Sequence, residues 1–153
     1  MRARRRLEPR EGQKRLLVPF TAGPLDPATL NAAIRIAKAE DGVLVPAYLL
    51  VVPLEFAEEA PLTAAVDVAM PLLEAVEHAS LRKRVPVDAR IERGRTATDA
   101  LSRLWDAERF DRIVIPAPAP GQTGFSPKEL AWILTHAPSE TIILRPTPVP
   151  AGV

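Results

Sequence analysis

The fold is decided by residues 110–134, FDRIVIPAPAPGQTGFSPKELAWIL. The apolar run at residues 113–115 is short enough to form a strand that is covered on both faces. The segment SPKE is typical of a helix start, because Ser126 can cap the helix, Pro127 suits its first position and Glu129 can accept a hydrogen bond from the Ser126 amide. The stretch therefore predicts a buried strand, a loop and a helix, the place where α/β domains usually hold a ligand.

The same pattern of strand, loop and helix repeats along the rest of the chain. Helical segments are indicated by apolar residues at spacings of three and four, and strands by short apolar or alternating runs. The expected strands are residues 15–20, 43–52, 85–92, 112–115 and 141–145. The expected helices begin at Asp26, Leu62, Ala97 and Pro127. This order predicts an α/β fold with a doubly wound, five-stranded parallel sheet and helices on both faces.

Prolines set three local expectations. Pro46 lacks the amide hydrogen that a paired strand needs, so we expect regular pairing of the second strand only from Ala47. Pro71 is expected to kink the second helix or to split it in two. Pro86 and the alternation of residues 85–92 favour a strand at the edge of the sheet, with one face in water.

Length and composition limit the class of protein. The chain has 153 residues, 47% of them hydrophobic, which suits one globular domain with a substantial core. It contains no cysteine, which excludes disulfides, thiolate nucleophiles and cysteine-bound metals and favours a reducing, cytoplasmic location. The longest apolar run, residues 43–54, is too short to cross a bilayer. We therefore expect no membrane association.

Charge is distributed unevenly along the chain. The first fifteen residues hold seven Lys/Arg and two Glu, and the remainder has 13 Lys/Arg against 17 Asp/Glu, a net charge of −4. An acidic body argues against nucleic-acid binding. Residues 1–13 read as a disordered basic arm, residues 14–146 as the α/β domain, and residues 147–153 as a proline-rich tail.

The last strand has no helix after it to cover it. An unprotected edge beside Ile142, Ile143 and Leu144 would favour aggregation. Pairing of residues 141–145 with the same strand of a second copy would remove that edge. We therefore predict a homodimer through the fifth strand.

Several segments together resemble the universal stress protein family. They are residues 14–19 (KRLLVP), 90–101 (RIERGRTATDAL), 111–115 (DRIVI), 136–138 (HAP) and 141–144 (TIIL). The resemblance covers nearly all of the expected domain. It implies a strand order of 3-2-1-4-5 and dimers through the last strand.

The resemblance also implies where ATP would bind, and here the sequence departs from the family. ATP-binding members carry an acidic residue after the first strand and the pattern Gly-x-x-Gly, nine residues, Gly-Ser/Thr after the fourth. In this chain the acidic position is Thr21, the first two glycines are Pro116 and Ala119, and the final pair is Pro127-Lys128. Residues 121–124, GQTG, contain a displaced Gly-x-x-Gly.

Physical chemistry agrees that phosphate binding is weakened. A phosphate loop works through backbone N–H groups near a helix N-terminus, and prolines supply none. We therefore expect no tightly bound cofactor, with ATP disfavoured. The candidate cleft-lining residues are Thr21, Ala22, Gly23, Val52, Gly94, Pro116, Gly121, Thr123, Gly124 and Ser126.

Three functions are compatible with these features. The first is a dimeric stress-response or regulatory protein that acts through a protein partner or a small ligand without tight ATP binding. The second is an ATP- or AMP-binding switch that uses an altered loop. The third, an enzyme that activates a substrate with ATP, lacks an identifiable catalytic group, so we do not expect an enzyme. Two histidines without cysteine also argue against a metal site.

Overall fold

The structure, a computed structural model, describes residues 10–147; the expected basic arm and proline-rich tail lie largely outside this range. Within it, five parallel strands form one sheet of order β3-β2-β1-β4-β5, which confirms the predicted topology. The elements in chain order are β1 Arg15–Phe20, α1 Pro27–Ala39, β2 Val43–Val51, α2 Thr63–Arg82, β3 Arg90–Gly94, α3 Ala97–Ala107, β4 Arg112–Pro116, α4 Pro127–His136 and β5 Glu140–Leu144.

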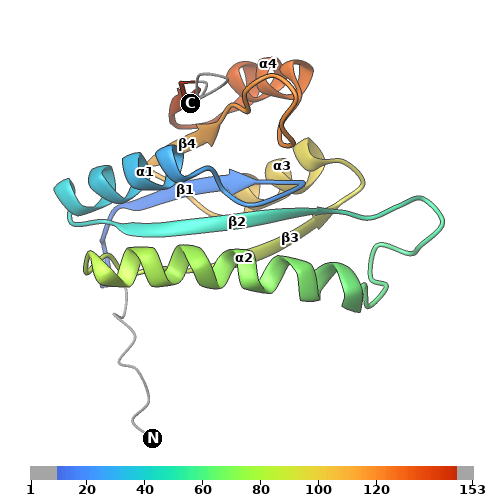
Figure 1. The fold of residues 1–153 in the computed structure, drawn as a ribbon, viewed down its shortest axis with the longest axis horizontal. Helices are drawn as coiled ribbons and strands as arrows, with labels where there is room; N and C mark the ends of the chain where they lie inside the picture. The colour runs from blue at the N-terminus through green and yellow to red at the C-terminus, as the bar shows by residue number, and fades with distance from the viewer. Residues whose placement is uncertain (1–9, 148–153) are drawn as a thin grey trace, which may run out of the picture.

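The sheet has a hydrophobic core on each face. Leu17, Ile113 and Ile115 pack with buried residues of α3 and α4 on one face. Leu16 and Val18 pack with buried residues of α1 and α2 on the other. In Figure 1, α1 and α2 lie in front of the sheet, and the connection from β2 to α2 extends beyond its carboxyl edge. Two helices on each face are what a doubly wound sheet requires.

Three helices begin at a side-chain cap, and the cap at Ser126 is the one that the sequence predicts. Asp26 accepts a hydrogen bond from the Thr29 amide (3.0 Å), and Thr96 accepts one from the Asp99 amide (3.1 Å). Ser126 and Glu129 form a complete capping box around Pro127. Each cap satisfies an amide that the first helical turn leaves without a partner.

The structure corrects three expectations about element boundaries. β2 pairs with β1 from Val43, not from Ala47, although its ladder with β3 does begin at Ala47. The Leu44 amide donates to the Pro86 carbonyl, on the β3 side. Backbone groups of alternate residues point to the same side of a strand, so residue 46 also faces β3. The N–H that Pro46 lacks is therefore not one that would bond to β1. α2 continues through Pro71 as one helix of 20 residues. The edge strand β3 is confirmed, but it begins at Arg90, and Val87 makes only an isolated bridge.

The two central strands stay paired for only a short distance. β1 pairs with β2 over six residues, but with β4 only at Leu16–Arg112 and Leu17–Ile113. Beyond Ile113, β4 pairs only with β5. The sheet is therefore open between β1 and β4 on the side where the β1–α1 and β4–α4 loops emerge. None of the helices in residues 10–147 is long and apolar enough to cross a membrane.

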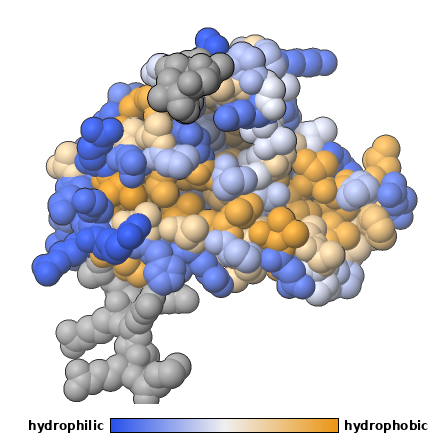
Figure 2. Space-filling view, viewed as in Figure 1, coloured by the Kyte–Doolittle hydropathy of each residue, from blue (hydrophilic) through white to orange (hydrophobic). Residues whose placement is uncertain are grey.

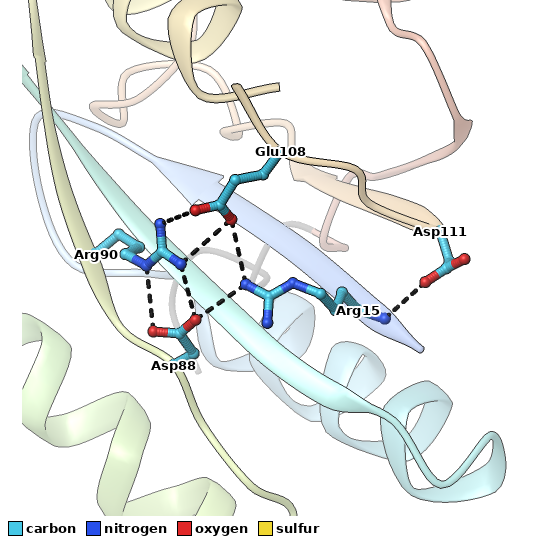
Figure 3. Close-up of polar contacts among 5 residues, drawn as sticks. All are labelled: Arg15, Asp88, Arg90, Glu108 and Asp111. Atoms are coloured by element: carbon cyan, nitrogen blue, oxygen red, sulfur yellow. Dashed lines mark hydrogen bonds and ion pairs between the residues drawn. The ribbon is translucent and has the colours of Figure 1, made fainter. Parts of the chain in front are cut away.

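At the opposite edge, two arginines and two carboxylates tie the starts of β1 and β3 to the end of α3 (Figure 3). Arg90 donates to Asp88 (2.9 Å) and to Glu108 (2.6 Å), and Arg15 donates to the same two carboxylates (2.9 and 3.3 Å). The Arg15 amide also donates to Asp111 (2.9 Å). Each charge thus faces two of opposite sign, at partly buried positions.

This network moves the pKa values of its members. The hydrogen bond from Arg90, helped by Arg15, lowers the pKa of Asp88 despite partial burial. Neighbouring Glu92 lacks such a donor, and burial raises its pKa. A carboxylate with a lowered pKa stabilises the fold while it is ionised. The stabilisation by Asp88 is therefore complete above about pH 4 and is lost as the pH falls through its lowered pKa.

We predict that Asp88→Asn lowers the free energy of unfolding by about 1 kcal/mol at pH 7, a modest value because the network is partly exposed. The difference from the parent should shrink as the pH falls below about 4, where Asp88 itself becomes protonated. Urea unfolding at a series of pH values measures both. Asp67→Asn, on the exposed side of α2, is the control. If the variant remains less stable than the parent by the same free energy of unfolding at low pH, the assigned role of Asp88 is contradicted.

Candidate functional site

A cavity of about 490 Å³ lies where β1 and β4 separate, between the β1–α1 and β4–α4 loops. Its position at the carboxyl ends of the central strands is the usual ligand site of an open α/β sheet. It is lined by Phe20, Thr21, Pro24, Leu25, Asp26, Pro27, Pro116, Ala117, Pro118, Gln122, Thr123, Gly124, Phe125 and Pro146. Apolar side chains and prolines thus form most of the wall.

On the β1 side, the hydroxyl that lines the cavity is already engaged. The buried Thr21 hydroxyl donates to the Leu49 carbonyl (2.8 Å), which ties the end of β1 to β2. Gly23 lies so close to the opposite loop that an added Cβ would be 2.9 Å from the Thr123 hydroxyl oxygen. The two loops therefore meet across the cleft, at the place where a phosphate group would need space.

On the β4 side, prolines and internal hydrogen bonds remove several of the backbone amides that could bind an anion, although the amides of Ala119, Gly121 and residues 123–125 make no hydrogen bond within the described chain. Prolines at positions 116, 118, 120 and 127 have no N–H. Ala117 donates to the Leu144 carbonyl (2.9 Å), and Gln122 donates to the Ala119 carbonyl (3.0 Å). Gly121 and Gly124 both have positive φ, at 82° and 141°, but Gly124 packs directly against Pro118. The glycines thus shape a tight turn beside the prolines.

The α4 N-terminus is closed by its own capping box. The Ser126 amide donates to the Glu129 carboxylate (2.9 Å), and the Glu129 amide donates to the Ser126 hydroxyl (3.1 Å). A helix N-terminus attracts anions through free N–H groups and its positive dipole end. Here Glu129 already supplies the anion, so a phosphate would have to displace it.

The charge of the cavity also opposes a phosphate. Among the described residues that line it, Asp26 is the one ionised side chain, and no Lys or Arg joins it. Its carboxylate caps α1, so it is held in place by the helix. A triphosphate would enter an uncharged or negative wall without a cation to offset its charge. Among the described residues, the lining therefore offers ATP no cation to offset its charge.

The structure brings together only part of the predicted set of site residues. Thr21, Pro116, Thr123 and Gly124 line the cavity. Ala22, Gly23, Gly121 and Ser126 belong to the two loops without lining it. Val52 and Gly94 lie apart, at the ends of β2 and β3, where the Val52 amide donates to the Gly94 carbonyl (2.9 Å).

Gly94 has a packing role of its own. A Cβ at this position would be 2.5 Å from the Ala100 amide nitrogen and 2.9 Å from the Ala100 Cα, so only glycine lets α3 approach β3. The following residue, Arg95, donates to the carbonyls of Pro53 and Phe56 (both 2.8 Å) and holds the connection from β2 to α2.

Sequence reasoning missed several residues of the cavity wall. Phe20, Leu25 and Phe125 are buried beside it, and Pro146 closes it from the end of β5. Phe125 stands between Gly124 and the cap residue Ser126, and it is the one aromatic residue of the stretch 116–126, which was the available signal. Among the residues described here, no group of three or more His, Asp or Glu could hold a metal ion.

Neither a protein-family model nor a curated protein sequence matches this chain. Solved structures do. A universal stress protein family structure from Burkholderia pseudomallei superposes with a TM-score of 0.66 at 16% identity, covering 89% of this chain and 98% of that one. An Arabidopsis thaliana family member with AMP bound gives 0.64 at 16% identity, covering 91% and 97%. An Archaeoglobus fulgidus universal stress protein in complex with dAMP gives 0.63 at 10% identity, covering 85% and 96%.

These superpositions show that the chain has the universal stress protein fold over nearly its full length. The fold and strand order implied by the resemblance of the sequence are thereby confirmed. At 10–16% identity, the ligands of those proteins do not transfer to this cleft.

We predict that Gly94→Ala destabilises the domain by about 1–3 kcal/mol, because backbone atoms of α3 occupy the space for the new methyl group. Chemical denaturation measures the loss. Gly23→Ala is the matched control, since its methyl group would meet only the Thr123 hydroxyl, which can rotate away. Equal stability of the two variants would show that packing against α3 does not require glycine at position 94.

Proposed function

We propose that this protein, built on the universal stress protein fold, is a cytoplasmic, dimeric regulatory protein of the universal stress type that does not bind ATP tightly. It acts through a protein partner or a small ligand and catalyses no reaction of its own. The observation that carries the proposal is the cleft, whose loops meet at Gly23 and Thr123, whose prolines remove several amides, and whose lining includes no Lys or Arg among the described residues.

A small, largely uncharged ligand fits this cleft better than a nucleotide does. The wall offers the rings of Phe20 and Phe125 and several prolines, together with polar groups at Gln122 and Asp26. A mostly apolar wall with few polar groups is typical of small-molecule sites. The Asp26 carboxylate would favour a ligand that donates a hydrogen bond or carries a positive charge.

A second candidate is an AMP- or ATP-dependent switch. The structures with AMP and dAMP bound favour it, since they share this fold. In this chain such binding would require the β4–α4 loop to move away from Gly23 and the capping box of α4 to open.

Calorimetry with ATP and Mg²⁺, and separately with AMP, decides between the candidates. We expect no binding in the low-micromolar range, and no nucleotide in the mass spectrum of protein purified without added ligand. Low-micromolar affinity for either nucleotide would establish the switch instead. Thr123→Gly, which removes the hydroxyl beside Gly23, should increase any residual affinity if the contact between the loops is what excludes the nucleotide.

The proposed dimer interface is the free edge of β5. Ile142 packs toward the α1–α2 face and Ile143 toward the α3–α4 face, and both remain partly exposed. The Leu144 carbonyl accepts a hydrogen bond from the Ala117 amide, so the backbone groups of Leu144 face β4. Successive residues of a strand point to opposite sides, so the amides of Thr141 and Ile143 point to the open edge. A second copy of β5 could pair with them.

We predict that Thr141→Pro weakens the dimer and leaves the monomer folded. Proline at this position removes an amide that faces away from β4, and a two-fold interface loses the bond twice. Two lost hydrogen bonds correspond to a rise of about tenfold or more in the dimer dissociation constant. Sedimentation equilibrium measures it, with Thr141→Val as the control that keeps the amide and the β-branched shape. A parent chain that is monomeric at micromolar concentration would refute the interface.

A further inference from the structure

A second concavity, of about 800 Å³, lies between α1 and α2, away from the cleft. Four of the residues that line it are cationic, two from each helix region, and its floor is apolar. They are Arg35 and Lys38 of α1, Arg82 and Lys83 at the end of α2, and the floor residues Ile34 and Ala79. Figure 2 shows hydrophilic residues gathered at the end of the molecule where α1 and α2 terminate, beside an apolar band. We call this concavity the basic groove.

The four cations of the basic groove lack opposite charges. Elsewhere in the described chain, arginines form ion pairs, as Arg90 does with Asp88 and Arg112 with Glu40. None of the four has an ion pair with another residue in the range 10–147, and no acidic residue of that range lines the groove. Four like charges around one concavity repel one another unless an anion joins them.

The basic side chains are partly held in position. Lys38 Nζ donates to the Lys83 carbonyl oxygen (3.2 Å), which links the ends of the two helices. Arg35 Nε donates to the Asn31 carbonyl oxygen (3.4 Å), which leaves its two terminal nitrogens free of any contact recorded within the described residues. The groove thus has donors on both sides, two of them held by one hydrogen bond each.

Helix dipoles account for only part of this arrangement. Lys38 and Arg82 lie in last turns, where the negative dipole end favours a cation. Arg35 lies a full turn earlier, so this effect does not explain it. Two helix C-termini carry about −0.5 charge each. The four full positive charges outweigh them, and the net potential in the groove is positive.

The surroundings limit the size of the anion. Glu74 and Glu77 precede the groove on α2, whereas Glu40 and Asp41, which follow α1, are already paired with Arg112 and Arg10. A long polyanion such as a nucleic acid, or an anionic membrane, would extend beyond the four cations that line the groove, toward Glu74 and Glu77. A compact anion stays within the basic groove. Several phosphates on a small molecule supply the charge density that pairs of Arg and Lys recognise.

We propose that the basic groove, where Arg35 and Lys38 of α1 face Arg82 and Lys83 of α2, binds a compact, multiply phosphorylated small molecule. The apolar floor at Ile34 and Ala79 accommodates the uncharged part of such a ligand. This site is separate from the cleft at β1 and β4 and does not depend on what that cleft binds.

Calorimetry with inorganic tripolyphosphate at low ionic strength tests the proposal. We expect binding by the parent chain, and an affinity at least tenfold lower in the double variant Arg35→Gln/Arg82→Gln. The control Arg109→Gln/Lys128→Gln removes the same charge elsewhere on the surface and should change the affinity less than twofold. Equal losses in both variants, or no binding by the parent at millimolar tripolyphosphate, would overturn the proposal.

Two further measurements separate binding from folding. The variant Arg35→Lys/Arg82→Lys keeps the charges and should retain most of the affinity, whereas its loss together with an intact fold would count against a charge-based site. Tripolyphosphate should raise the melting temperature of the parent and not that of the glutamine variant. If a single-stranded oligonucleotide or vesicles containing phosphatidylserine bind through Arg35 and Arg82 while tripolyphosphate does not, the occupant is a macromolecule or a membrane and the small-molecule proposal is wrong.

Discussion

The rest of the structure depends on one missing hydrogen-bond donor in the central strand. The Val43 amide donates to the Lys14 carbonyl, so the backbone groups of Lys14 face β2. Successive residues face opposite sides of the strand, so Pro19, an odd number of residues further on, faces β4. The ladder between β1 and β4 ends at Leu17 and Ile113, just before the position where the amide of residue 19 would continue it. Proline is normally excluded from central strands for this reason. In this chain it opens the sheet at the topological switch point, where a ligand cleft forms.

The residue type that opens the cleft also decides its chemistry. Pro116 ends β4 at the opposite wall, and its position faces β1, since the adjacent Ala117 amide is directed to β5. Neither Pro19 nor Pro116 can bridge the opening or donate to a ligand within it. Further prolines in both loops replace amides that an anion would need, while their fixed φ stiffens the walls. Proline therefore gives the cleft both its largely apolar wall and a reduced number of backbone donors.

The sequence predicted the order of elements, the sheet topology and the cap at Ser126, because these depend on local periodicity and on side chains within three residues of the cap. The capping box at Ser126 and Glu129 is an example, and it already indicated that the α4 N-terminus supplies its own anion. Boundaries that depend on a neighbouring strand were less predictable. The alternation of residues 85–92 fits a strand, but regular pairing starts only at Arg90. Contacts between distant loops, such as Gly23 with Thr123, leave no local pattern, so the closure of the cleft could not be foreseen.

The topology of the fold separates the cations of the basic groove from the cleft. Helices of a parallel α/β sheet run opposite to the strands, so the ends of α1 and α2 lie toward the amino edge, away from the loops that form the cleft. Lys38 and Lys83 are 45 residues apart in sequence, and only the packing of both helices on one face of the sheet brings them together. The cleft wall, by contrast, has a carboxylate at Asp26 and no cation among the described residues that line it. In this chain four cations thus gather at the helix ends, and none lines the cleft at the carboxyl edge of the sheet among the described residues.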